Sequence, residues 1–321
     1  MKKSLKLLAA LFILSLLFVG CDNEDDPIVD NGDKAVKIEK KNDKALLLCT
    51  FGSTFEAPHQ TYKGMVAKFK KEFPGMDVYL SFTSTTCITR WGAKTKEYYT
   101  TPDHWLKAIG KAGYKKVMVQ SLHVIPGEEY LMLRDYYVKK FKKEHEDISV
   151  VVGDPLLVSD RDIKEVAEVL YNAFKPRLDK GEAVAFLGHG NPENSYSSAN
   201  MSYHRIKDYM QQNLDKKMFV GTVDCEDMLL DYVMDDMSKV IKEGTTVNLT
   251  PLMSIAGDHA NNDMAGDYDK DESDEDQSWK VQLKKAGYQI EDENCVLKGL
   301  GDYPEIVNIW VRHLKEAMSA E

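Results

Sequence analysis

Features that mark several common protein classes are missing from this sequence of 321 residues. Its five cysteines include no C-x-x-C pair, so no zinc ribbon or related cysteine motif is expected. Acidic residues outnumber basic ones and give a formal net charge of -10, which argues against binding to nucleic acid or to an anionic membrane face. After the first 20 residues no run is apolar enough to span a bilayer. The glycine-rich loops carry no phosphate fingerprint, which counts against a plain anion-binding module.

The N-terminal segment has the features of an export signal. Three lysines lie within the first six residues, and a short apolar run at 7–19 ends in small residues before Cys21. This pattern predicts a secretory signal peptide at 1–20. The cleavage region is similar to a bacterial lipobox, in which Cys21 carries the lipid; secretion without a lipid is the alternative. Residues 21–43 are polar and unpatterned, which predicts a lipidated flexible tether. We therefore expect an exported cell-envelope lipoprotein, on the periplasmic face or the outer surface, that touches the membrane only through its N-terminal lipid.

The rest of the chain alternates short apolar runs with amphipathic stretches. The apolar runs, which predict strands, are 45–50, 77–82, 116–122, 148–152, 183–187, 218–223 and 246–252. The helical patterns include 59–73, 100–113, 128–146, 160–178, 198–214, 226–243 and 278–287. Apolar strands that alternate with helices are typical of parallel sheets covered by helices on both faces. We therefore predict an α/β fold.

The two halves of the chain resemble each other in three places. The matching stretches, in the same order in both halves, are 48–54 with 185–191, 77–84 with 217–224, and 117–130 with 247–260. Each match alone is weak, because short apolar strands resemble one another by chance. Together they predict two similar α/β lobes, at 44–178 and 179–321, with the seam near 175–182.

The matching stretches also point to a candidate site. Each contains a loop that leaves the carboxyl end of a predicted strand, which is where parallel α/β sheets bind ligands. At these positions the second lobe carries His189, Asp224 and His259, whereas the first carries Ser53, Ser84 and Glu129. Two imidazoles and a carboxylate are the ligand set of an open divalent-metal site. Asp258 and Asp263 are expected to accept hydrogen bonds from the imidazoles and fix their tautomers.

Each of these residues also has an ordinary structural interpretation. A histidine after a glycine at a strand end is often a turn residue bonded to the backbone. Glu226 competes with Asp224 for the role of ligand, and either could cap a helix. His123 either reaches the crevice or is a packed core histidine, and the Glu128–Glu129 pair is either an acid/base group or the acidic first turn of a helix. The acidic run 266–279 is a solvated loop or a collector of cations. The remaining histidines, at 59, 104, 145, 204 and 313, are expected to face solvent.

Eight motifs taken together resemble a known family. They are LLLCTFGST (46–54), FTSTTCITR (82–90), VMVQSLHVIPGEEY (117–130), FLGHGN (186–191), FVGTVD (219–224), PLMSIAGDHANNDMAGD (251–267), DQSWK (276–280) and GLGDYPEI (299–306). In this order they resemble the anaerobic sirohydrochlorin cobaltochelatases and, more distantly, the class II ferrochelatases. The resemblance implies two flavodoxin-like lobes that face a central cleft. It also implies an enzyme that inserts a divalent metal, Co²⁺ before Fe²⁺ or Ni²⁺, into sirohydrochlorin or a related tetrapyrrole.

The resemblance also assigns roles to residues of this chain. His189 and His259 match the family's GHG and GDHA histidines, which bind the metal and take part in proton removal. Asp224 stands where the family has a metal-binding glutamate, so the carboxylate here is one methylene shorter. Glu128 is a further catalytic candidate. The residues expected to bind the substrate are Ser53, Arg90 and His123.

The export signal allows a second hypothesis, because tetrapyrrole synthesis is ordinarily cytoplasmic. In this alternative the protein is a non-catalytic envelope lipoprotein that binds metal, haem or another tetrapyrrole for uptake. Both hypotheses predict metal at His189 and His259, and turnover distinguishes them. A homo-oligomer is compatible with the sequence under either one.

Overall fold

The computed structural model of the chain describes residues 32–321, apart from the side chains at 33, 193–195 and 197. The expected signal peptide, Cys21 and the first part of the expected tether lie outside the described residues. None of the described helices is long and apolar enough to cross a membrane.

The last part of the expected tether packs against the first lobe. Val36 and Ile38 contact a core cluster of that lobe. Asp77 accepts hydrogen bonds from the backbone N–H of Lys41 at 2.8 Å and of Asn42 at 3.1 Å. The prediction of a flexible tether is therefore wrong for this part, because apolar side chains and a fixed carboxylate hold it against the sheet.

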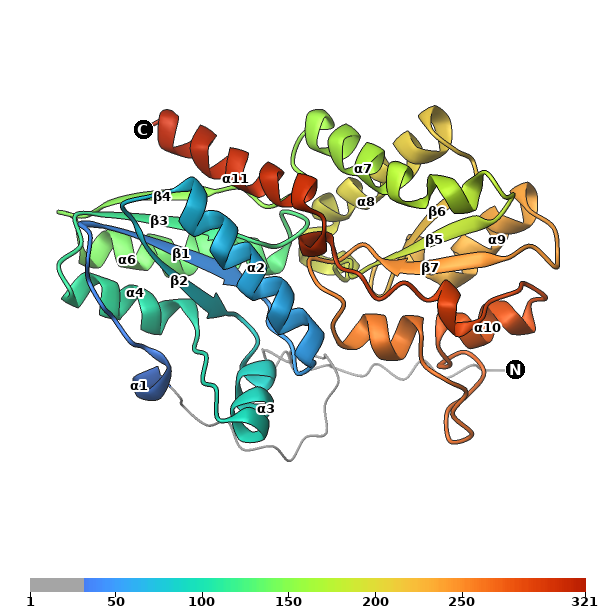
Figure 1. Cartoon of the computed structure of the whole chain (residues 1–321), viewed down its shortest axis with the longest axis horizontal. Helices are drawn as coiled ribbons and strands as arrows, with labels where there is room; N and C mark the ends of the chain where they lie inside the picture. Colours follow the sequence, from blue (N-terminus) through green and yellow to red (C-terminus); the bar gives the residue numbers. More distant parts are fainter. Residues whose placement is uncertain (1–31) are drawn as a thin grey trace, which may run out of the picture.

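The first half of the chain forms a parallel four-stranded sheet in the order β2-β1-β3-β4 (Figure 1). Its strands are β1 (Lys44–Thr50), β2 (Asp77–Phe82), β3 (Lys116–Ser121) and β4 (Ser149–Gly153). The helices and helical turns of this half are α1 (Gly32–Ala35), α2 (Glu56–Glu72), α3 (Thr85–Thr95), α4 (Pro102–Lys111), α5 (Glu128–Leu131), the π-helix η1 (Met132–Val138) and α6 (Lys139–Glu144). Successive side chains of a strand point to opposite faces. Leu46 and Leu48 accordingly join the core cluster that includes α2, and Leu47 joins the one that includes α4 and α6.

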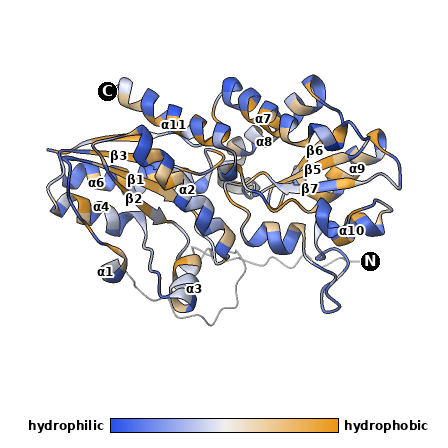
Figure 2. Ribbon diagram, in the orientation of Figure 1, coloured by the Kyte–Doolittle hydropathy of each residue, from blue (hydrophilic) through white to orange (hydrophobic). Residues whose placement is uncertain are grey.

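The second half forms a parallel three-stranded sheet in the order β6-β5-β7. Its strands are β5 (Ala183–Gly188), β6 (Met218–Thr222) and β7 (Val247–Pro251). The helices and helical turns are α8 (Glu193–Asn213), η2 (Glu226–Met228), α9 (Leu230–Val240), η3 (Ala260–Met264), α10 (Trp279–Lys285), η4 (Asp292–Asn294) and η5 (Leu300–Asp302). Figure 2 shows that the strands are mostly hydrophobic and that many helices have a hydrophilic side. The order β6-β5-β7 repeats β2-β1-β3, and the three matching stretches of sequence fall on these strand pairs, so the two halves share one topology.

Two long helices are exchanged between the halves (Figure 1). Helix α7 (Asp160–Leu178) follows β4 but packs against β5 and α8 of the second sheet. Helix α11 (Pro304–Ser319) ends the chain but packs against β3, β4 and α2 of the first sheet. The predicted lobe boundaries are therefore wrong for these two helices, because each finds its apolar partners on the other sheet. One core cluster consequently runs through both halves.

A buried carboxylate joins the two exchanged helices. Asp162, in the first turn of α7, is fully buried. It accepts hydrogen bonds from Arg312 at 2.7 Å and from His313 Nε2 at 2.9 Å, both on α11. It also forms a capping box with Ser159 at the start of α7. Both helices are thus tied to one charged group between the lobes.

Candidate metal centre

The three candidate ligands of the second lobe follow its three strands. His189 comes directly after β5, Asp224 shortly after β6, and His259 after β7 at the start of η3. Because the strands are parallel and ordered β6-β5-β7, their loops are neighbours at one edge of the sheet. The ring centroids of the two histidines lie 4.8 Å apart, with their planes at 83°. The two imidazoles are therefore close enough to share one cation.

Asp224 is the carboxylate that faces His189. Its Oδ2 lies 3.2 Å from His189 Nδ1, and the backbone N–H of Asp224 donates to the His189 carbonyl oxygen at 2.9 Å. The competing residue, Glu226, is exposed on η2. The His189 side chain is 45% exposed, so a cation can reach it from solvent. Of the two acidic candidates, the geometry thus favours Asp224 as a ligand.

His259 is held by a carboxylate one turn further along. Its Nδ1 is hydrogen-bonded to Asp263 Oδ2, which leaves Nε2 for a cation. Burial by itself lowers the pKa of His259, but the hydrogen bond and charge of Asp263 outweigh burial. The charges of Asp258 and Asp224 act in the same direction, and the net result is a raised pKa. His259 is therefore more basic than an ordinary histidine, as an acceptor of protons requires.

Two glycines allow the sharp turn that carries His189. Gly190 has φ of +85°, and a Cβ there would lie 2.8 Å from the backbone nitrogen of Cys225. A Cβ at Gly188 would lie 2.4 Å from the ring of Tyr203. The Tyr203 hydroxyl accepts a hydrogen bond from the His189 backbone N–H at 3.3 Å. Close packing on both sides therefore fixes the direction of the histidine, as the glycine spacing indicates.

Loops of the first lobe meet these loops from the opposite side. The backbone N–H of Glu128 donates to Asn191 Oδ1 at 3.1 Å. A Cβ at Gly257 would lie 3.7 Å from Ser53 Oγ. The carboxyl edges of the two sheets therefore face each other, and the candidate metal ligands lie between the lobes.

Glu129 contacts His123 and Thr83 of the first lobe. Its carboxylate accepts a hydrogen bond from Thr83 Oγ1 and lies 3.5 Å from His123 Nε2. Burial alone raises the pKa of Glu129, but His123, Thr83 and the charge of His189 outweigh burial and lower it. The pKa of Glu128 is raised by burial and by the charge of Glu129. His189 therefore acts electrostatically on Glu129, whereas Glu128 contacts the second lobe through its backbone. The sequence indicates Glu129 as well, since Glu129 and His259 hold equivalent positions in the two halves.

The three residues expected to bind substrate have different surroundings. Ser53 is buried, and its Oγ accepts a hydrogen bond from the Phe55 backbone at 3.1 Å. His123 is buried, and its Nδ1 lies 2.9 Å from Ser121 Oγ. These surroundings fit the interpretation of His123 as a packed core histidine. Arg90 is partly buried on α3. Burial raises the pKa of Cys87 on α3, and the charge of Asp258 acts in the same direction, whereas the charge of Arg90 lowers it. Charges from α3 and from the loop that carries His259 therefore act on the same thiol.

Fold and site together define a class: a two-lobed α/β protein whose candidate metal ligands lie between the lobes. Solved structures support the fold. The chain is similar to SirB from Bacillus subtilis with Fe³⁺, with a TM-score of 0.56, 16% identity, and coverage of 86% of this chain and 96% of that one. The sirohydrochlorin chelatase SirB from Bacillus subtilis subspecies spizizenii in complex with cobalt gives a TM-score of 0.54 at 13% identity, covering 86% of this chain and 95% of that one.

Sequence comparison narrows the class to a family. The model of the family described as cobalt chelatase (CbiK) matches residues 44–319. The sirohydrochlorin cobaltochelatase CbiKC of Nitratidesulfovibrio vulgaris is 32% identical over 281 residues, covering 86% of this chain and 91% of the relative. The sirohydrochlorin cobaltochelatase of Salmonella typhimurium is 30% identical over 291 residues, covering 86% of this chain and 97% of the relative. The chain therefore belongs to the cobalt chelatase (CbiK) family.

Proposed function

We propose that this protein is a chelatase that inserts Co²⁺, in preference to Fe²⁺ or Ni²⁺, into sirohydrochlorin or a closely related tetrapyrrole. The observation that carries the proposal is the pair of imidazoles at 4.8 Å with Asp224 3.2 Å from one of them. Membership of the cobalt chelatase family supports a role of this pair in metal insertion. The two relatives are named as chelatases of sirohydrochlorin, which favours an enzyme over a binding protein without turnover.

The proposed mechanism follows from what metal insertion requires. Two pyrrole protons must leave the macrocycle as the cation enters, and the cation must be held without being trapped. His189 and His259 bind the cation through neutral imidazoles on an open face, and Asp224 reduces its net charge. A closed set of four protein ligands would retain the cation, whereas three leave a position for the macrocycle nitrogens.

The departing protons need acceptors near the macrocycle. The His259–Asp263 pair is one acceptor once the cation has passed from His259 Nε2 to the macrocycle and freed that nitrogen, since the carboxylate raises the pKa of the imidazole. We assign the other to Glu129, whose carboxylate is held 3.5 Å from His123 Nε2. From Glu129 a proton can pass to His123. Glu128, the expected catalytic glutamate, is assigned a place at the contact between the lobes.

The substrate's carboxylates need cationic partners, because the protein as a whole is acidic with a net charge of -10. We assign this role to Arg90 on α3, on the side of the first lobe that faces the His259 loop. Ser53 is assigned to positioning of the macrocycle, since it lies opposite Gly257.

Turnover tests the proposed enzyme. Under anaerobic conditions, the protein mixed with Co²⁺ and excess sirohydrochlorin is expected to convert many equivalents of tetrapyrrole per chain, followed by the change in the absorbance of the macrocycle. The control is the spontaneous reaction at the same Co²⁺ concentration. A single equivalent of bound tetrapyrrole with no rate above this control would refute the enzyme and support capture.

We further propose that the protein acts outside the cytoplasm, anchored by a lipid on Cys21. The lysine-rich start, the apolar run at 7–19 and the cysteine after it support this proposal. Cells grown with a labelled fatty acid are expected to label the wild-type protein and not Cys21→Ala, with the label and the protein in the membrane fraction. Wild-type protein found unlabelled in the cytoplasmic fraction would contradict both the location outside the cytoplasm and the lipid anchor.

A further inference from the structure

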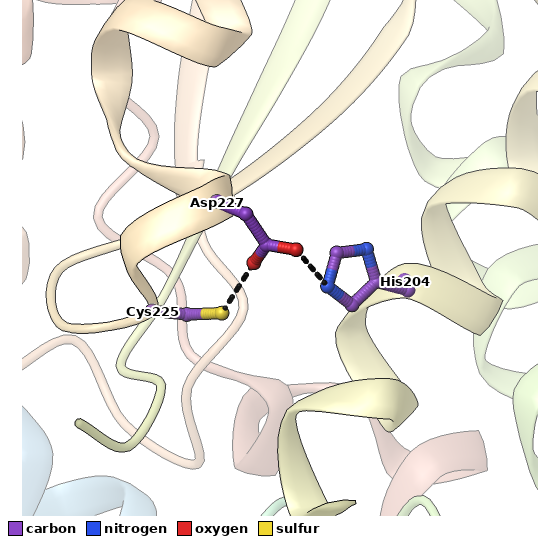
Figure 3. A group of neighbouring side chains, drawn as sticks. All are labelled: His204, Cys225 and Asp227. Atoms are coloured by element: carbon purple, nitrogen blue, oxygen red, sulfur yellow. Dashed lines mark hydrogen bonds and ion pairs between the residues drawn. The ribbon is translucent and has the colours of Figure 1, made fainter. Parts of the chain in front are cut away.

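A second group of side chains of metal-ligating types consists of His204, Cys225 and Asp227 (Figure 3). His204 comes from α8, Cys225 from the loop after β6, and Asp227 from η2. One ligand atom from each residue lies within 4.8 Å of the other two. Asp227 Oδ1 accepts a hydrogen bond from Cys225 Sγ at 3.0 Å, and Asp227 Oδ2 lies 3.3 Å from His204 Nε2. The carboxylate thus lies between a thiol and an imidazole.

We propose that His204, Cys225 and Asp227 form a second binding site for a divalent cation of borderline softness, such as Co²⁺ or Zn²⁺. One nitrogen, one sulfur and one carboxylate oxygen suit these ions better than Mg²⁺ or Ca²⁺, which prefer oxygen ligands alone. In a tetrahedral site with bonds of about 2.0–2.3 Å, neighbouring ligand atoms lie roughly 3.3–3.8 Å apart. The separations of 3.0 and 3.3 Å involve the two different oxygens of Asp227, and a set with one ligand atom per residue spans up to 4.8 Å, so cation binding requires the side chains to draw closer together.

Burial around the group leaves one side open for the cation. Cys225 is 3% exposed, so its sulfur is shielded from solvent. The side chains of His204 and Asp227 are 24% and 56% exposed, so a cation can enter past the carboxylate. The thiol then releases its proton to solvent, and the thiolate replaces the hydrogen bond to Asp227 with a bond to the cation. The fourth position remains available to water.

The group belongs to the same loop as the candidate centre but uses different residues. Cys225 follows Asp224 directly, and its backbone N–H donates to Thr222 Oγ1 at 3.1 Å. The Cys225 backbone also packs against Gly190, next to His189. One loop would therefore carry ligands to two neighbouring cations. The second site does not depend on metal insertion, since it requires only the three side chains in their observed places.

Anaerobic titration of the full chain with Co²⁺ tests the second site. The wild type is expected to show a thiolate-to-cobalt charge-transfer band in the near ultraviolet, and Cys225→Ser is expected to lose this band and one bound Co²⁺ per chain. Asp227→Asn and His204→Gln are expected to weaken binding at this site at least tenfold. Cys87→Ser is the matched cysteine control, and His189→Ala is the control for the other centre. Both controls should keep the band.

Two results would overturn the second site. One is a wild type without the band, which would leave the three residues as a hydrogen-bonded group only. The other is a band and a Co²⁺ stoichiometry that persist in Cys225→Ser. If Cys225→Ser fails to fold, Asp227→Asn decides the question, because its carboxylate is largely exposed. Unchanged Co²⁺ affinity in that variant would equally reject the site.

Discussion

Replacement of His259 by alanine is expected to lower the rate of metal insertion by at least about 100-fold, the usual effect of losing a positioned proton acceptor. The variant loses both a ligand of the cation and the imidazole whose pKa Asp263 raises. His189→Ala is expected to lower the rate to a similar degree, because its ring lies 4.8 Å from that of His259 and the two act on one cation. The measurement is the anaerobic rate at saturating sirohydrochlorin and Co²⁺.

The matched control for these variants is His104→Ala. This histidine lies on α4, away from the second sheet, with its side chain 37% exposed. Its replacement is expected to change the rate by less than about twofold, as for a surface substitution far from the site. Circular dichroism should show that all three variants are folded. A folded His259→Ala protein with the wild-type rate would exclude the imidazole from the reaction.

His259 also determines how the rate of metal insertion is expected to depend on pH. Only the neutral imidazole binds the cation and accepts a proton, so the rate falls as the pH decreases through the raised pKa of His259. Asp263→Asn removes the main cause of the raised pKa and is expected to move this acid limb to lower pH. The protonated His259–Asp263 pair stabilises the fold below the unfolded pKa of about 6.5, and this contribution is lost as the pH rises through the folded pKa.

Replacement of Asp162 by alanine is expected to lower the free energy of unfolding by about 3–5 kcal/mol, the usual cost of removing one partner of a buried ion pair. The variant leaves the buried His313 of α11 without its carboxylate, leaves Arg312 paired only with Glu165 and Glu316, and removes the capping box of α7. Chemical denaturation measures the change. Hydrogen exchange should be faster in α11, because the exchanged helix loses its tie to α7.

Asp160→Ala is the matched control for this variant. Asp160 occupies the same first turn of α7, but its side chain is 98% exposed and pairs with Arg205 at the surface. Exposed pairs contribute about 0–1 kcal/mol, so this variant should be close to wild type. Equal, small effects of the two substitutions would show that the buried network does not hold the exchanged helices.

Acid should remove the contribution of Asp162. Burial alone raises the pKa of this carboxyl, but its hydrogen bonds to His313, Ser159 and Arg312 outweigh burial and hold the pKa well below its ordinary value. The stabilisation is therefore complete above the unfolded value of about 3.8 and is lost as the pH falls below it. The Asp162→Ala variant should therefore lose less stability than the wild type as the pH falls through this range.

Much of the fold could be predicted from the sequence, because it depends on local patterns. The seven apolar runs correspond to the strands of the described residues within one or two positions, and the helix expected at 160–178 has those bounds. The helical patterns leave out 85–95 and 304–319, which form α3 and α11. The exchange of α7 and α11 could not be predicted, because an apolar helix face does not specify which of two similar sheets it covers.

The candidate site could be predicted in its residues but not in its distances. The matching stretches located His189, Asp224 and His259 at strand ends, whereas their spacing depends on the order β6-β5-β7. The expectation that the other histidines face solvent was wrong for His59 and His313, which are buried. His59 stacks on Trp91 with ring centroids 3.5 Å apart, and His313 pairs with Asp162, 151 residues earlier. Such partners are distant in sequence and are set only by the packing.

One cation is expected to bind between the lobes to His189, Asp224 and His259. A crystal structure of the protein soaked with Co²⁺ under anaerobic conditions, with anomalous diffraction at the cobalt edge, tests this claim most directly. An anomalous peak is expected within bonding distance of both imidazoles and the Asp224 carboxylate. The expectation would be contradicted by a crystal in which Co²⁺ fully occupies a different site while His189 and His259 bind no metal.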